Sequence, residues 1–262
     1  MDDPISRDRG PGNFQKAVRL IRQSSSKTME GMDEILFPRR CPVCLNIVMP
    51  RGGLICEACR HKLLPIGESR CMKCGKPIKR ELDEYCTDCK VKKRHFVTGI
   101  AGFSYESVPV RRLISRVKYH NERQLLDYPC LVMAERFHKL AESFGLSCLI
   151  PVPLHPSRRR KRGFNQADEI AKRLGGTWDI PVAYKLLYRV KKTVPQKELD
   201  EAEREKNLAG AFEMRPDERG IPLRAGLVDD IYTTGSTMEA CTLALLAAGV
   251  EEVYSIVLAA VP

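Results

Sequence analysis

The chain has 262 residues, of which 43% are hydrophobic and 29% are charged. This balance is ordinary for a soluble globular protein and excludes a chain that is disordered throughout. The formal net charge is +11, and residues 1–98 carry 20 Lys and Arg against 12 Asp and Glu, which weakly favours a polyanion such as nucleic acid as a partner.

The N-terminal segment contains no secretory signal. Its apolar positions between residues 14 and 21 are interrupted by Lys16 and Arg19, so the apolar core of a signal peptide is missing. No run along the chain approaches the ~20 apolar residues of a transmembrane helix. We therefore expect a cytoplasmic protein without a membrane span, in which paired cysteines hold metal rather than form disulfides. Residues 1–32 are polar and broken by Pro, Gly and Ser, which predicts a flexible tail.

Residues 33–95 form a cysteine module with an internal duplication. Each half has two CxxC pairs about a dozen residues apart, and each cysteine of the second half lies 30 residues after its counterpart. Such spacing lets four thiolates converge on zinc. The module therefore predicts two structural Zn²⁺ sites, with sequential or crossed pairing both open, made by Cys41, Cys44, Cys56, Cys59, Cys71, Cys74, Cys86 and Cys89.

Zinc also weakens the case for nucleic acid, because two Zn(Cys)₄ sites would lower the net charge of residues 1–98 by about 4. Lys90 to Arg94 then forms a basic linker. Few aromatic side chains are available in this third of the chain for base stacking, and they are Phe14, Phe37, Tyr85 and Phe96.

The next segment predicts one strand and two helices. Residues 96–105 alternate as a strand does, a helix begins at Pro109, and a long helix is expected over residues 125–144. The polar face of the first helix carries cations that are either solvated or line an anion site, namely Arg111, Arg112, Arg116 and Lys118.

A second strand, at residues 148–153, precedes a basic stretch. Residues 154–164 read as a loop, and Asn165 caps a helix that should end before Gly175. Five consecutive cations, Arg158 to Arg162, lie between this strand and this helix, where they suit a pyrophosphate. A solvated basic loop or a general nucleic-acid patch is the alternative. Two short strands, at 180–183 and 186–190, and a charged helical stretch at 198–207 follow.

The last segment contains the strongest motif, at residues 227–237. An apolar strand end is followed by Asp229 and Asp230, and then by a Thr-Gly-Ser turn that opens a helix ending at Gly249. The backbone N–H groups and hydroxyls of such a turn can hold a phosphate, with help from the helix dipole. Two carboxylates just before it can accept hydrogen bonds from a ribose diol. The order predicts a ribose 5-phosphate site, and residues 253–258 form a final strand.

The stretch 227–237 resembles the signature for 5-phosphoribosyl pyrophosphate (PRPP) of the type I phosphoribosyltransferases. Two further stretches, Pro151 to Pro153 with Arg162 to Ala167, and Leu36 to Cys41, resemble the ComF/ComFC competence family, and the resemblance covers nearly the whole chain from about residue 33. It implies an N-terminal zinc-ribbon module at 33–95 and, at 96–262, an α/β domain of the type I phosphoribosyltransferase fold, Rossmann-like, with a mainly parallel sheet and flanking helices.

The resemblance also implies a role for each candidate residue. Asp229 and Asp230 are the catalytic pair that holds the ribose hydroxyls, and Mg²⁺ accompanies the PRPP. The residues that bind the 5-phosphate are then Thr233, Thr234, Gly235, Ser236 and Thr237, and those that bind the pyrophosphate are Arg158, Arg160, Lys161 and Arg162. A flexible hood contains Gln196, Arg204 and Asn207.

One departure from the phosphoribosyltransferase pattern is informative. Purine-salvage members carry a third Asp, which acts as a base, where this chain has Thr233. Either an acceptor that needs no base, or no acceptor at all, fits better. Two functions therefore remain open. One is a competence protein for DNA uptake that binds PRPP, handles single-stranded DNA and works with helicase or recombination partners. The other is a metabolic phosphoribosyltransferase acting on an unidentified base or amine.

Overall fold

The computed structural model describes residues 38–49, 53–78, 80, 82–190, 208, 210–216, 218 and 220–262. The predicted tail at 1–32, the helical stretch at 198–207 and the hood residues Gln196, Arg204 and Asn207 lie outside these ranges. Among the described residues, no helix is long and apolar enough to cross a membrane.

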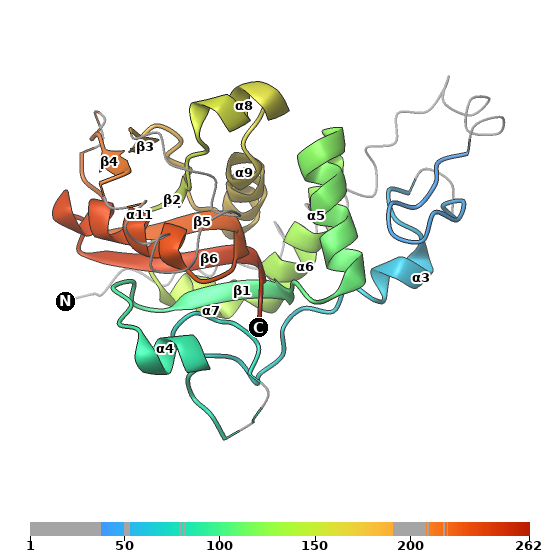
Figure 1. Ribbon diagram of the computed structural model, residues 1–262, viewed down its shortest axis with the longest axis horizontal. Coiled ribbons are helices and arrows are strands. Elements are labelled where there is room, and N and C mark those ends of the chain that lie inside the picture. The colour runs from blue at the N-terminus through green and yellow to red at the C-terminus, as the bar shows by residue number, and fades with distance from the viewer. Residues whose placement is uncertain are drawn as a thin grey trace, which may run out of the picture.

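The centre of the molecule is a four-stranded, fully parallel sheet in the order β1-β6-β5-β2 (Figure 1). Its strands are β1 (Gly99–Ser104), β2 (Cys148–Pro151), β5 (Arg224–Tyr232) and β6 (Glu252–Ala260). All four are apolar along most of their length, as strands covered on both faces must be. An isolated parallel bridge from Leu149 to Val182 extends the β2 edge. A separate antiparallel ribbon joins β3 (Leu187–Arg189) to β4 (Phe212–Met214).

Different elements cover the two faces of the sheet. One face is covered by α5 (Val108–His120), α6 (Asp127–Arg136) and α9 (Gln166–Trp178), whose apolar stripes join one hydrophobic cluster with Phe103 and Leu258. The other face is covered by α11 (Ser236–Ala247), the β3–β4 ribbon and the second cysteine cluster. The remaining helices in the described part of the chain are α3 (Glu57–Arg60), α4 (Thr87–Val91), the 3-10 turn η1 (Arg123–Leu126), α7 (His138–Ser143) and α8 (Pro156–Arg162).

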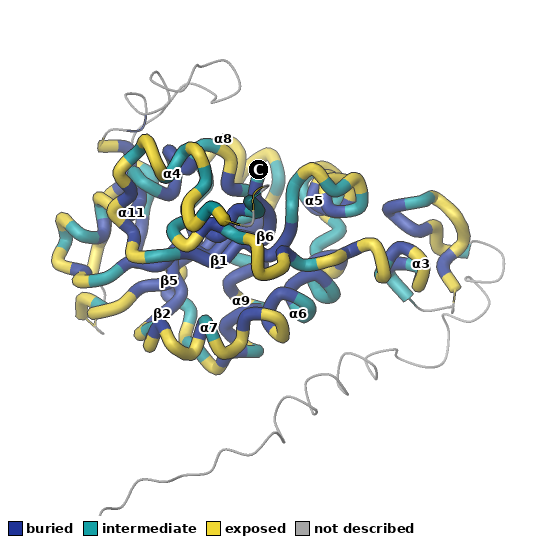
Figure 2. The backbone as a smooth tube through the Cα atoms, turned by 90° about the horizontal axis from the view of Figure 1, so that it is seen from below, coloured by how far each residue is buried: buried dark blue, intermediate teal, exposed yellow. Residues whose placement is uncertain are grey.

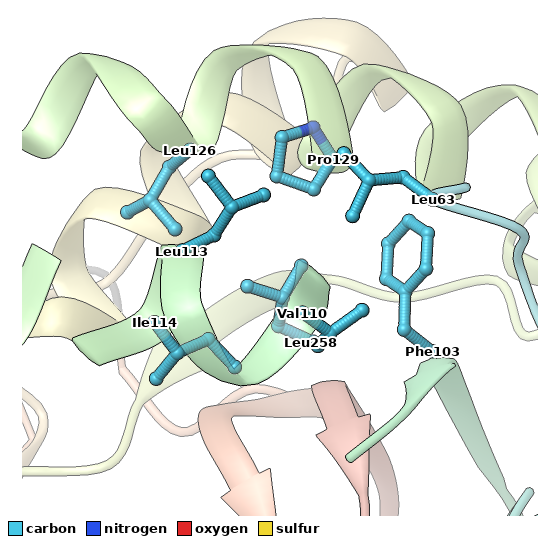
Figure 3. A pocket seen from close by; sticks show the side chains of 8 residues that line it. All are labelled: Leu63, Phe103, Val110, Leu113, Ile114, Leu126, Pro129 and Leu258. Atoms are coloured by element: carbon cyan, nitrogen blue, oxygen red, sulfur yellow. The ribbon is translucent and has the colours of Figure 1, made fainter. Parts of the chain in front are cut away.

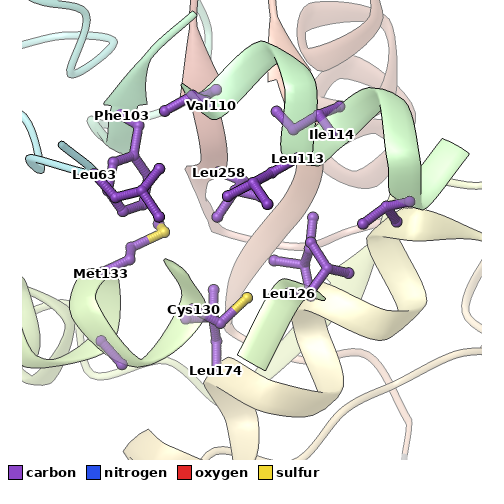
Figure 4. Packing of buried hydrophobic residues seen from close by; sticks show 14 of the residues in the cluster. Leu63, Phe103, Val110, Leu113, Ile114, Leu126, Cys130, Met133, Leu174 and Leu258 are labelled. Carbon is purple, nitrogen blue, oxygen red and sulfur yellow. The ribbon is translucent and has the colours of Figure 1, made fainter. Parts of the chain in front are cut away.

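The fold class expected from the sequence is confirmed, with an N-terminal cysteine module and a parallel α/β sheet with flanking helices. Figure 2 shows the buried residues running through the central strands and the inner sides of the helices. The core is tightly packed. A small void of about 10 Å³, wholly apolar, lies between α5, η1, α6 and the strands β1 and β6 (Figures 3 and 4). Because its lining residues offer no polar group, this void is a packing feature rather than a functional site.

Three expectations about helices differ from the structure. The long helix predicted over 125–144 is divided at Phe137, whose φ of −112° is not helical and whose ring is buried. The helix at Asn165 continues past Gly175 to Trp178, whose indole N–H donates to Ala134 O at 3.1 Å. A Cβ at Gly175 would meet Ile180 O at 2.7 Å. A glycine there is needed for close packing and does not end the helix.

The third difference concerns the stretch predicted as a loop at 154–164, which contains α8. Pro156 occupies its first turn, where proline is tolerated, and Nδ1 of His155 accepts a hydrogen bond from the Ser157 N–H at 3.2 Å. The cations that follow are good helix formers. The strand predicted at 180–183 is reduced to the single bridge at Val182.

Candidate functional site

The candidate site lies at the carboxyl end of the parallel sheet, between β2 and β5. These strands are neighbours, but the helices that follow them, α9 and α11, pack on opposite faces of the sheet. The two connections therefore diverge at the strand ends, which is where open α/β sheets bind ligands. The predicted stretch 158–162 lies in the connection after β2, and the stretch 229–237 begins on the last residues of β5 and continues into the connection to α11.

The predicted phosphate loop connects β5 to α11. Gly235 has a φ of +79° and directly precedes the first helical residue, Ser236. The Thr234 and Ser236 hydroxyls are 2.9 Å apart, while Thr233 is exposed and Thr237 half-buried. The first N–H groups of a helix have no partner inside the helix, and α11 is 12 residues long. The loop therefore combines backbone donors, hydroxyls and a helix N-terminus, as an anion site requires.

The acid pair lies within β5, near its C-terminal end, rather than after the strand. Successive strand residues point to opposite faces, and the two carboxylates accordingly have different surroundings. Asp230 forms a 2.8 Å ion pair with Lys118 at the end of α5, whereas Oδ1 of Asp229 accepts a hydrogen bond from the Asp230 N–H at 2.8 Å. Burial, followed by the charge of Asp230, raises the pKa of Asp229 to about 7. The pair thus concentrates negative charge that a diol, a metal ion or a proton can satisfy.

Lys118 resolves one alternative that the sequence left open. The basic face of α5 is not simply solvated: Lys118 reaches Asp230, Arg112 donates to Val43 O, and Arg116 pairs with Glu122. Figure 1 shows α5 standing upright beside the sheet, with its last turn near the end that carries α8. The end of α5 therefore forms one wall of the candidate site.

The cations predicted to bind pyrophosphate are carried by α8. Arg158, Arg160 and Lys161 are exposed, and Arg162 donates to the Gln166 side chain at 2.8 Å while its guanidinium lies 5.7 Å from the centre of the Tyr119 ring. The C-terminal end of α8, which carries Arg162, thus approaches the last turn of α5. A helix fixes the relative positions of these cations more closely than the predicted loop would.

One charged residue of the site was not anticipated from the sequence. Arg189, on β3, is half-buried, with its guanidinium 5.5 Å from the centre of the Phe212 ring. Burial, followed by the charge of Arg158, lowers the pKa of Arg189, and the carboxylate of Asp229 opposes that shift. Arg189 therefore connects the acid pair with α8 electrostatically. Nothing in the local sequence of this short strand identifies it, since the connection arises only when the chain folds.

The eight cysteines form two separate clusters. Within each cluster the four sulfurs lie within 4.8 Å of one another, and the clusters are Cys41, Cys44, Cys56 and Cys59, and Cys71, Cys74, Cys86 and Cys89. The Cys44–Cys56 and Cys74–Cys86 sulfurs are both 3.6 Å apart. A tetrahedral zinc ion about 2.3 Å from each sulfur would separate them by about 3.8 Å. Both clusters therefore fit a structural zinc ion, with the sequential pairing.

A basic groove of about 510 Å³ lies on the α11 side of the sheet. This basic groove is the space between residues 92–95, the residues Leu208, Gly210 and Phe212, and the α11 side chains from Ser236 to Ala244. Lys93 is exposed, and His95 is paired with Glu239 through both its backbone N–H and its ring. Phe212, the aromatic residue of the lining, is only 7% exposed. The groove therefore offers positive charge and little surface for stacking.

Comparison with known proteins agrees with these features. A family profile for the double zinc ribbon domain matches residues 33–90. "Competence protein F" of Haemophilus influenzae is 32% identical over 225 residues, which cover 83% of this chain and 95% of that protein. "Competence protein ComFC" of Bacillus subtilis is 25% identical, over 74% of this chain and 79% of its own. "DNA utilization protein YhgH" of Salmonella typhimurium is 28% identical, over 80% and 85%.

Proposed function

Because the chain belongs to the ComF family of competence proteins, we propose that it serves DNA uptake or use by binding PRPP at the end of β5 and single-stranded DNA along the basic groove. The observation that carries the PRPP assignment is that three chemically different parts follow or end two neighbouring strands, β2 and β5, at the same edge of the parallel sheet. These parts are a carboxylate pair, a phosphate loop and a helix of cations. The names of the relatives, competence and DNA utilization proteins, support the DNA role.

Each part of the site suits one part of PRPP. The loop from Thr233 to Thr237 would hold the 5-phosphate with backbone donors and hydroxyls, and Asp229 and Asp230 would accept hydrogen bonds from the ribose hydroxyls. The cations of α8, Arg158, Arg160, Lys161 and Arg162, would neutralise the pyrophosphate. Mg²⁺ would arrive with the pyrophosphate and would neutralise part of its charge. The hood residues Gln196, Arg204 and Asn207 are proposed to close over the ligand.

Titration calorimetry with Mg²⁺-PRPP tests this assignment. We expect the wild-type protein to bind, and Asp229→Asn/Asp230→Asn to lose binding while its thermal midpoint and its zinc content are retained. Asp179→Asn, at the exposed C-terminal cap of α9, is the control for removal of a carboxylate and should bind normally. Equal affinity of the double variant and the wild type would contradict the site.

The DNA assignment rests on charge. Lys92 and Lys93 line the basic groove, and its aromatic residue is buried, so binding should be dominated by ionic interactions with phosphates and should weaken steeply with salt. We expect Lys92→Glu/Lys93→Glu to weaken binding of an oligothymidylate at low salt and to flatten the slope of log affinity against log salt by about 0.7 for each phosphate that the variant no longer neutralises. Lys139→Glu/Lys172→Glu, which changes exposed lysines elsewhere by the same charge, is the control. Equal weakening in both variants, or binding that is insensitive to salt, would contradict the groove assignment.

A phosphoribosyltransferase that acts on a small base or amine is the second candidate. It is favoured by the presence of cations for a leaving pyrophosphate. Thr233 cannot act as a general base, which restricts such an enzyme to acceptors that need none. Release of pyrophosphate from Mg²⁺-PRPP across a panel of nucleobases, ammonia and single-stranded DNA separates the candidates. Release that depends on an acceptor and is abolished in the double Asn variant would establish a transferase. Binding of PRPP without release would favour a ligand-binding role.

A further inference from the structure

Arg94 joins the cysteine module to the predicted phosphate loop. It lies five residues after the last zinc-ligand candidate, Cys89, and its side chain is only 6% exposed. Its Nη2 donates a hydrogen bond to the backbone oxygen of Thr234 at 2.6 Å, across 140 residues of sequence. A guanidinium stays charged at all ordinary pH values. The loop therefore has a permanent cation bonded to its backbone from the side of the zinc module.

This hydrogen bond constrains the direction of the loop donors. In a trans peptide unit the C=O and the following N–H point in opposite directions. Fixing the Thr234 oxygen on Arg94 therefore turns the Gly235 N–H away from Arg94 and from the module that carries it. Thr234 is followed directly by Gly235, in the left-handed conformation, and by Ser236, the first residue of α11. The same hydrogen bond therefore sets the position of the first backbone N–H donors of the phosphate loop.

A second route connects the same module to the loop. The Lys76 side chain is almost fully buried, its ammonium forms a 2.5 Å ion pair with Asp88, and it lies 5.6 Å from the centre of the Tyr232 ring. A Cβ added at Gly235 would collide with that phenol ring, so the loop backbone rests directly on Tyr232. Lys76 follows Cys74 by two residues, and Asp88 lies between Cys86 and Cys89. Both partners of the ion pair are thus set by the geometry of the second cysteine cluster.

We propose that the second zinc site, Cys71, Cys74, Cys86 and Cys89, is thermodynamically coupled to the phosphate loop, with Arg94 as the positioning residue that transmits the coupling. This inference rests on the proposed binding of PRPP. Zinc fixes the second cluster, the cluster fixes Lys76 and the linker to Arg94, and these residues hold Tyr232 and Thr234. The first zinc site has no such link to the loop among the described residues.

Calorimetry on Arg94 variants tests the positioning role. We expect Arg94→Met to bind Mg²⁺-PRPP about tenfold more weakly than the wild type, because it lacks the charge-assisted hydrogen bond that orders the loop. Arg94→Lys keeps a charged donor and should recover most of the affinity. Both variants should keep two zinc ions per chain. Arg60→Met removes an arginine that lies 5.4 Å from the Tyr128 ring beside the first cluster and should bind PRPP normally.

The possible results separate this inference from the proposal on which it rests. Unchanged affinity in Arg94→Met, with a wild type that binds, would overturn the coupling alone. No binding by the wild type would overturn the PRPP assignment and the coupling together. Equally weakened binding in Arg60→Met would show a general decrease in stability and would also overturn the positioning role.

Coupling must be reciprocal, which provides a second test. In Cys56→Ser/Cys59→Ser the first site is disabled, so competition with a chromogenic zinc chelator reports the second site alone. We expect Mg²⁺-PRPP to raise the zinc affinity of that site by the factor by which zinc raises the affinity for PRPP. The same protein carrying Asp229→Asn/Asp230→Asn corrects for zinc taken up by PRPP itself. A zinc affinity that PRPP leaves unchanged relative to this blank would overturn the coupling.

Discussion

The two cysteine clusters are copies of one sequence pattern, yet they have different surroundings. The second cluster lies against the sheet: the Thr98 hydroxyl donates to Met72 O at 2.5 Å, and a Cβ at Gly75 would meet Ala101 N at 2.7 Å. The first cluster lies beyond α5, at the edge of the molecule (Figure 1), where Arg112 donates to Val43 O. Both units have buried residues, but the duplicated module thus supplies one unit that packs on the sheet and one that packs beside α5.

Equivalent residues of the two clusters differ accordingly. Gly75 has a φ of +74°, and its counterpart 30 residues earlier, Leu45, holds the same left-handed conformation at +66° while being 63% exposed. Glycine is required where the turn touches β1, whereas a strained leucine is tolerated at the edge. The pair between the buried Lys76 and the partly exposed Asp88 has Asn46 and Ala58 at the equivalent positions of the first cluster. Only the second copy therefore carries the charged residues that lie against the end of β5.

Removing zinc ligands should give the largest contrast between the clusters. We expect Cys86→Ser/Cys89→Ser to lower the thermal midpoint by about 10 °C or more, because this change disables a structural metal site that packs directly against β1. Cys56→Ser/Cys59→Ser should lower it by only a few degrees, since the first cluster contributes less to the sheet. Calorimetric unfolding, together with zinc content, measures both. Equal midpoints for the two variants would contradict the comparison.

The Lys76–Asp88 ion pair should give the next largest effect. Asp88→Ala leaves the Lys76 ammonium, whose side chain is 4% exposed, without its partner. Because the Asp88 side chain is 39% exposed, water can take its place, and the change should cost about 2 kcal/mol of unfolding free energy. Lys76→Asn/Asp88→Ala, which introduces the residues of the first cluster, should be less damaging than Asp88→Ala alone. Denaturant unfolding with zinc present measures the two. A double variant less stable than the single one would show that the ion pair is not what distinguishes the copies.

The left-handed turns should give effects of opposite sign. Gly75→Ala forces a Cβ against the backbone of β1 and should destabilise by about 2 kcal/mol. Leu45→Gly relieves a strained conformation and should stabilise the first cluster by roughly 0.5–1 kcal/mol. Zinc affinity of each cluster, measured by competition with a chelator, reports both changes. Destabilisation by Leu45→Gly would mean that the exposed leucine makes an interaction that offsets its strain.

Local patterns were sufficient for part of the fold and the site. The cysteine spacing predicted the zinc clusters, and the sequence of carboxylates, threonines and glycine predicted the connection from β5 to α11, because the chemistry of each is contained within a few residues. The helix α8 could have been predicted as well, since Pro156 and the run of arginines are compatible with a helix, but five consecutive cations show none of the apolar periodicity by which helices are recognised.

Contacts between distant segments could not be predicted in this way. The hydrogen bond from Arg94 to Thr234, the ion pair from Lys118 to Asp230 and the position of Arg189 depend on which strands become neighbours. No periodicity or spacing encodes those partners. The pairing of the cysteines stayed open for the same reason until their sulfurs were placed in space.

The most direct test of this account is hydrogen–deuterium exchange of the full-length protein with and without Mg²⁺-PRPP. We expect the ligand to slow exchange in residues 229–237, and also in the second cluster and its linker, residues 71–95, while residues 41–59 of the first cluster exchange at the same rate. Exchange that is unchanged at residues 229–237, or slowed equally in both clusters, would contradict the assignment of the phosphate loop and the distinction between the two zinc sites.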